Sequence, residues 1–141
     1  MTINQAQDDI IAQFSELDDW MDRYQLLIDL GQEQPPLPAS DKTEQNLIEG
    51  CQSRLWLICE EREGRLYFRA ESDAIIVKGI VSLLINILGG HTPVDILNAD
   101  LYFIDRIGLT EHLSPTRSNG LLSMLRQMRR FALVYKTKLS Q

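Results

Sequence analysis

Residues 53–70 read SRLWLICEEREGRLYFRA, and this stretch decides the fold. Residues 53–59 are rich in strand-forming side chains, and residues 65–70 partly alternate between apolar and polar types. Glu61-Arg62-Glu63-Gly64 between them is typical of a hairpin turn. The pattern predicts two short antiparallel strands. Because two strands alone are marginal, it leaves room for a third strand that would precede or complete the sheet.

A long apolar segment follows the hairpin. Residues 74–88 read AIIVKGIVSLLINIL, with Asp73 as a possible N-terminal cap and Gly89-Gly90 as a terminator. The β-branched side chains disfavour a helix, and two strands are the alternative. We prefer a helix because the segment is longer than an ordinary strand and contains no turn signal. A helix that is apolar on nearly every side is expected at the buried centre of the fold.

The residues before the hairpin predict one or two amphipathic helices that end at Gly31. Residues 34–40, QPPLPAS, contain three prolines and predict a loop between these helices and the sheet. The apolar residues at helical spacing are Ile10, Ile11, Phe14, Leu17, Trp20, Tyr24, Leu27 and Ile28.

After the central helix, Thr92-Pro93-Val94-Asp95 has the cap, proline and carboxylate of a helix start. A last long helix is predicted to begin near Ser114-Pro115-Thr116, with basic side chains on its outer surface. Its expected inner face comprises Leu121, Met124, Leu125, Met128, Ala132 and Tyr135. The order predicts an α+β fold, a small antiparallel sheet covered by helices, in a single domain of residues 1–141.

Composition excludes several classes of function. The 141 residues fit one domain, and 14 basic against 20 acidic residues give a net charge of −6. That charge argues against nucleic acid and against an anionic membrane as the main partner. The N-terminus lacks the basic start and apolar run of a secretory signal, and residues 74–88 are shorter than the ~20 residues that span a bilayer. With two cysteines, we expect a cytoplasmic protein in a reducing compartment.

The chemistry is expected at Cys51, where a polar, glycine-containing segment meets the first strand. A thiolate is a strong sulfur nucleophile, and a nearby positive charge, from Arg54 or from Arg117 at the start of the last helix, would raise the thiolate fraction. On these grounds alone, a small core residue is an equally open interpretation of Cys51. Cys59, inside an apolar strand, is interpreted as a core residue.

Other uses of the cysteines are disfavoured. An extended chain puts Cys51 and Cys59 about 26 Å apart, beyond the ~7 Å limit for a disulfide. A zinc site with His91 and His112 lacks any close ligand spacing, and no nucleotide-binding motif is present, so we expect neither metal nor cofactor. A cysteine–histidine hydrolase using either histidine, and an adaptor with a structural Cys51, remain as alternative functions.

Three blocks of sequence resemble one family. Residues 50–57, GCQSRLWL, are similar to the active-cysteine motif of the SufE/CsdE sulfur-acceptor proteins, although Leu55 stands where valine is more usual. Residues 72–79 and 112–121 match the family in the same order, and the resemblance runs from about Ile10 to about Ala132. It implies an α+β fold similar to the IscU-type scaffold proteins.

The resemblance also implies a function. Cys51 would accept persulfide sulfur from a pyridoxal-phosphate cysteine desulfurase of the SufS or CsdA type and speed that enzyme's turnover. In the SufE branch the sulfur would pass to the SufBCD scaffold for iron–sulfur cluster assembly, whereas a CsdE-type acceptor would serve another sulfur recipient. The chain would be an accessory protein without a cofactor of its own. The motifs do not separate the SufE from the CsdE branch, of which SufE is preferred.

The resemblance further assigns roles to the residues around the thiol. Gly50, Gln52 and Ser53 would shape the loop, and Arg117 would support docking or charge. Because a bare persulfide is easily lost or oxidised, we expect the loop to fold Cys51 against apolar surface at rest and to swing it out on docking.

Overall fold

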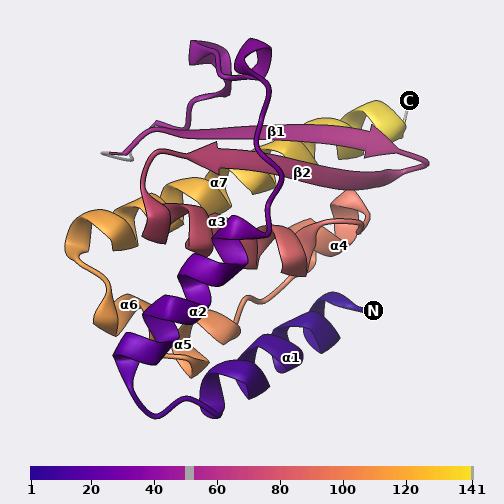
Figure 1. Ribbon diagram of the computed structural model, residues 1–141. Coiled ribbons are helices and arrows are strands. Elements are labelled where there is room, and N and C mark those ends of the chain that lie inside the picture. The colour runs from indigo at the N-terminus through magenta and orange to yellow at the C-terminus, as the bar shows by residue number, and fades with distance from the viewer. Residues whose placement is uncertain (50–52, 141) are drawn as a thin grey trace.

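The structure is a computed structural model that describes residues 1–49 and 53–140. Helices precede and follow one antiparallel hairpin, which confirms the predicted α+β class (Figure 1). The elements are α1 (Ile3–Ser15), α2 (Trp20–Gln32), the 3₁₀ turns η1 (Ala39–Asp41) and η2 (Glu44–Asn46), β1 (Leu55–Arg62), β2 (Arg65–Ser72), α3 (Ile75–Leu88), α4 (Pro93–Asn98), α5 (Phe103–Arg106), α6 (Leu109–His112) and α7 (Pro115–Leu139).

The hairpin forms at the predicted place, with longer strands. Glu63 and Gly64 have φ values of 53° and 81°, the left-handed pair that a two-residue turn between twisted strands requires. The inner face buries Leu55, Leu57, Leu66, Phe68 and Ala70. No third strand occurs in the described part of the chain. Two isolated bridges, Leu47 to Trp56 and Leu66 to His91, flank the hairpin instead.

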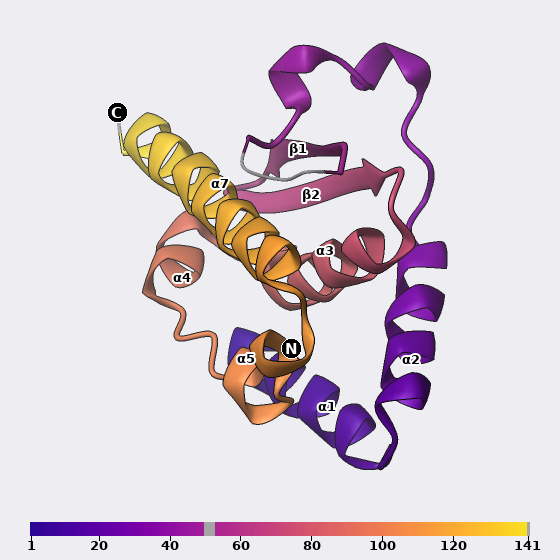
Figure 2. The same cartoon turned by 90° about the vertical axis from the view of Figure 1, so that its left-hand side faces the viewer.

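Helix α3 lies at the centre of the fold, as predicted. It packs against β2, α1, α2 and α7, and its middle residues are fully buried (Figure 2). Asp73 does not cap it, which corrects the sequence prediction. The cap position belongs to Ala74, and the Asp73 carboxylate instead accepts a hydrogen bond from the Arg54 amide. Asp73 therefore bonds to Arg54, which is distant in sequence, in place of capping the helix that follows it.

Gly31 lies inside α2 and does not end it, so the predicted helix stop is wrong. A Cβ at Gly31 would stand 2.9 Å from the Gly79 nitrogen, and one at Gly79 would stand 2.2 Å from the Leu27 carbonyl oxygen. The two glycines therefore allow α2 and α3 to cross in direct backbone contact. Because Gly31 and Gly79 are 48 positions apart, local sequence could not reveal this role.

The remaining helices frame this core. Thr92 caps α4 as predicted, and α7 begins at the predicted place with Ser114 as its cap. The predicted apolar face of α7 is buried apart from the half-buried Tyr135. The short helices α5 and α6 were not predicted, because four residues are too few to show a helical period. Buried Gln7 of α1 holds this region by accepting from the Phe103 amide and donating to the Asp100 carbonyl.

Candidate functional site

The loop that carries Cys51 is closed at its base. The Ile48 amide donates to the Leu55 carbonyl at 2.9 Å, and Leu47 pairs with Trp56. These contacts bring together the two ends of a six-residue segment, residues 49–54, which we call the Cys51 loop. The predicted site residues Gly50, Cys51 and Gln52 lie outside the described residues, whereas Ser53 is half-buried at the start of the return to β1.

A second set of hydrogen bonds fixes the end of the loop and is called the Arg54 clamp. The Arg54 amide donates to Asp73 Oδ1 at 3.1 Å, and the Asp73 amide donates back to the Arg54 carbonyl at 3.3 Å. The Ser72 hydroxyl donates to the same carbonyl at 2.7 Å and accepts from the Ala74 amide at 3.1 Å. The clamp therefore ties the last residue of the Cys51 loop to the start of α3.

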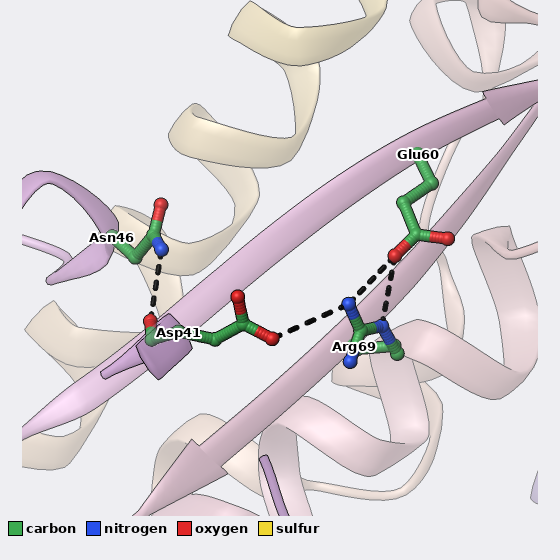
Figure 3. A network of polar contacts seen from close by, with 4 residues as sticks. All are labelled: Asp41, Asn46, Glu60 and Arg69. Atoms are coloured by element: carbon green, nitrogen blue, oxygen red, sulfur yellow. Dashed lines mark hydrogen bonds and ion pairs between the residues drawn. The ribbon is translucent and has the colours of Figure 1, made fainter. Parts of the chain in front are cut away.

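The segment leading into the loop is anchored on the outer face of the hairpin (Figure 3). Arg69 bonds Glu60 Oε1 through Nε at 3.0 Å and Nη2 at 2.6 Å, and Nη2 lies 3.6 Å from Asp41 of η1. Asn46 of η2 donates to the Asp41 carbonyl at 2.8 Å. Exposed ion pairs of this kind add little stability. Here they matter because they fix residues 41–46 against the hairpin, and so set the direction from which the chain enters the Cys51 loop.

A neighbouring pair of lysines anchors the same segment. The Glu71 carboxylate of β2 pairs with Lys42, which follows η1, and lies 4.0 Å from Lys78 of α3. The Lys42 ammonium also stands 5.7 Å from the centre of the Trp56 ring. Glu71 and Trp56 face each other across the hairpin, so residues 41–46 are attached to both strands next to the Cys51 loop.

Three exposed side chains, Arg54, Ile75 and Arg117, bear on the predicted site. Arg54 is exposed, and Ile75, the first residue of α3, keeps 61% of its surface accessible although it is apolar. Arg117 is also exposed, and its amide donates to the Ser114 hydroxyl. Its guanidinium forms no hydrogen bond or ion pair with another described residue.

The segment that precedes Arg117 is held by an aromatic stack. The Trp20 ring lies 3.9 Å from the His112 ring at 13°, and the Tyr24 hydroxyl donates to the His112 carbonyl. His112 Nδ1 is 3.0 Å from the Gly108 carbonyl oxygen. His112 is the last residue of α6 and packs against Trp20. Trp20 thereby helps to position the start of α7.

Cys59 differs from a reactive thiol. It lies on the inner side of β1, half-buried against the core, and it is a free cysteine. Burial, together with the negative charge of Glu60, raises the pKa of Cys59 to about 12. The thiol is therefore protonated at neutral pH, and its position against the core agrees with its interpretation as a packing residue.

The other titratable groups of the described residues form no second reactive or metal-binding site. Burial lowers the pKa of His91, whose carbonyl accepts from the Leu66 amide. Within residues 1–49 and 53–140, no three histidine, cysteine or acidic side chains are grouped closely enough to hold a metal ion. In the same residues, no helix has the length and apolarity to cross a membrane.

Comparison with known proteins defines the class to which this fold and loop belong. Residues 8–132 match the sequence profile of SufE, the Fe–S metabolism associated domain, and the chain belongs to this family. The family gives the chain a sulfur-acceptor role in iron–sulfur metabolism as the accessory partner of a cysteine desulfurase.

One relative supports the family, and one solved structure shares the fold. An uncharacterised SufE-like protein of Rhizobium meliloti (strain 1021) is 40% identical over 127 residues, which cover 86% of this chain and 91% of the relative. The solution structure of a hypothetical protein from Thermus thermophilus has the same fold, with a TM-score of 0.77 and 23% identity over 94% of this chain and 96% of that one.

Proposed function

We propose that the chain accepts persulfide sulfur on Cys51 from a cysteine desulfurase and delivers it for iron–sulfur cluster assembly. The observation that carries the proposal is the anchoring of both ends of the Cys51 loop, at Ile48–Leu55 and at the Arg54 clamp, beside exposed Arg54 and Ile75. A reactive group on a loop with fixed ends can be offered to a partner without disturbing the core.

The transfer needs only one nucleophile of this chain. The Cys51 thiolate attacks the terminal sulfur of the persulfide on the desulfurase cysteine. A new sulfur–sulfur bond forms on Cys51, the bond within the donor persulfide breaks, and the desulfurase cysteine leaves as a thiolate with the electron pair. No electrons enter or leave the pair of proteins. The chain needs no metal or cofactor for this step, and pyridoxal phosphate belongs to the desulfurase.

The neighbouring residues support the step. Gly50, Gln52 and Ser53 shape the loop, and Arg117 contributes positive charge for docking. At rest the Cys51 side chain folds against apolar surface, which protects the persulfide from oxidation, and docking turns it outward. By removing sulfur from the desulfurase, the acceptor also speeds its turnover. The preferred assignment is a SufE-branch protein that works with a SufS-type enzyme and SufBCD in the cytoplasm.

Intact-protein mass spectrometry tests this proposal. The wild type, Cys51→Ser and Cys59→Ser are incubated with an active SufS-type desulfurase and cysteine, without reductant. We expect the wild type and Cys59→Ser to gain the mass of one or more sulfur atoms and Cys51→Ser to gain none. A parallel incubation with a CsdA-type enzyme separates the two branches. Sulfur on Cys51→Ser, or on no variant with either enzyme, would overturn the proposal.

A further inference from the structure

The longest helix carries a charge opposite to the rest of the chain. α7 has six basic residues and no acidic one. Of the 14 basic and 20 acidic residues in the chain, this leaves eight basic and twenty acidic elsewhere, so α7 carries +6 and the remainder −12. None of the ion pairs among residues 1–49 and 53–140 involves α7. The helix is therefore a localised cationic surface on an acidic protein.

Arg117 lies in the first turn of α7, and the other five basic residues form two groups. Lys136 and Lys138 lie in the last turn, where the helix dipole favours cations. Arg126, Arg129 and Arg130 lie in the middle and are exposed. Like charges three and four positions apart destabilise a helix, and no described carboxylate forms an ion pair with them. Glu44 and Glu49 line one hollow with Arg126 and Arg130 but form no ion pair with them, so the arginines are available to an acidic partner.

The arginines line an apolar groove between α4 and α7, which lie beside each other in Figure 2. The groove has a volume of about 420 Å³, and its apolar wall comprises Leu97, Leu122, Leu125 and Leu133. Leu122 and Leu133 are each 57% exposed. Leucines together with three arginines fit a segment that is apolar on one side and acidic on the other.

Two arginines of the groove also line a hollow that reaches the first residue of the Cys51 loop. This second hollow, of about 360 Å³, is lined by Glu49 of that loop and by Arg126 and Arg130. From Ser123 to Leu133 the helix rises about 15 Å. A standard interface covers roughly 800 Å² on each partner, so one partner can cover both hollows together with the loop.

We propose that the α7 face comprising Leu122, Arg126, Arg129, Arg130 and Leu133 binds an acidic amphipathic segment of the cysteine desulfurase. This inference rests on the proposed function, since the enzyme that delivers sulfur to Cys51 must already cover the loop beside this face. The contact adds affinity and orients the acceptor, and it takes no part in the sulfur chemistry. Its charges also speed encounter with an acidic surface on the enzyme.

Two double variants on the same helix test the inference. Arg126→Glu with Arg130→Glu reverses two charges that line both hollows, and Lys136→Glu with Lys138→Glu makes the same charge change outside them. Affinity for a SufS-type desulfurase is measured by isothermal titration calorimetry at low and high salt. We expect the arginine variant to bind at least tenfold more weakly with a flatter salt dependence, and the lysine variant to stay within twofold of wild type. Thermal unfolding verifies that both variants fold.

Further measurements separate the possible failures. Loading of Cys51 from inorganic polysulfide should proceed at the wild-type rate in the arginine variant, because this donor needs no docking. Equal desulfurase affinity of the arginine and lysine variants would overturn the inference and leave the proposed function standing. If light scattering showed self-association that only the arginine variant lost, with desulfurase affinity unchanged, the occupant would be a second copy and the inference would be wrong. Failure of the wild type to accept sulfur from any desulfurase would instead overturn the proposed function.

Discussion

The two cysteines of this chain stand eight positions apart, in regions held together in different ways. Around Cys59 the hairpin packs against helices, and burial decides the state of the thiol. On either side of the Cys51 loop, the described chain is held by backbone hydrogen bonds and the Arg54 clamp, and exposed Arg54 and Ile75 stand nearby. One region is fixed by close packing, the other by anchored ends.

The difference shows how one residue type serves two purposes. Removing a thiol from water raises its pKa and makes it a packing group. A loop with fixed ends can present a thiol to a partner while the strands behind it stay in place. The chemical assignment of the two cysteines therefore depends on their surroundings more than on the residues themselves. Four measurements test the contrast between the closely packed region and the region with anchored ends.

The largest expected effect is on alkylation. At pH 8 a thiol of ordinary pKa, about 8.5, is about a quarter ionised, whereas one with the pKa of Cys59, about 12, is ionised to about one part in ten thousand. We expect iodoacetamide to modify Cys51 faster than Cys59, by up to about a thousandfold when the loop turns the Cys51 side chain outward. Peptide mass spectrometry follows the modification of each cysteine. In denaturant the two rates should converge. Alkylation rates of Cys51 and Cys59 within tenfold of each other in the folded protein would contradict the contrast between the two regions.

Next in size is the effect of filling the α2–α3 crossing. Gly79→Ala places a Cβ 2.2 Å from the Leu27 carbonyl oxygen, and backbone atoms cannot turn aside. We expect a loss of about 3 kcal/mol in unfolding free energy, measured by denaturant titration. Asn86→Ala, an exposed change on the same helix, should leave stability unchanged or slightly raised. A Gly79→Ala protein as stable as wild type would show that the helices do not need this close contact.

The fold was predictable where the signal is local, and much of the site was not. Strand-forming and turn residues predicted the hairpin, segment length without a turn signal predicted α3, and periodicity predicted α7, because each pattern lies within one segment. The roles of Gly31 and Asp73 were misassigned because their partners, Gly79 and Arg54, are 48 and 19 positions away. The burial of Cys59 followed from its apolar strand. No local pattern predicts the Arg54 clamp, since it depends on how β1 and α3 meet.

A smaller effect is expected at alkaline pH. The pKa of Cys59 is raised from 9.0 to about 12, so above pH 9 the unfolded chain loses a proton that the folded chain keeps. The folded state then binds more protons, and stability falls as pH rises between 9 and 12, by at most about 1.4 kcal/mol per pH unit. Comparing denaturant titrations of wild type and Cys59→Ala at pH 8.5 and 10 checks this. The difference between the two proteins should shrink at the higher pH, and a constant difference would contradict it.

The smallest effect concerns the Arg54 clamp itself. Asp73→Ala removes the acceptor of the Arg54 amide but keeps the backbone bond from the Asp73 position to the Arg54 carbonyl. We expect a loss of about 1 kcal/mol in stability and faster hydrogen exchange at the Arg54 amide, with the amides of Leu57 and Phe68 unaffected. Asp73→Asn retains an oxygen acceptor and should restore most of the protection. Unchanged hydrogen exchange at the Arg54 amide in Asp73→Ala would mean that packing, as in the core, holds this end of the loop. The contrast between the Cys59 region and the ends of the Cys51 loop would then be wrong.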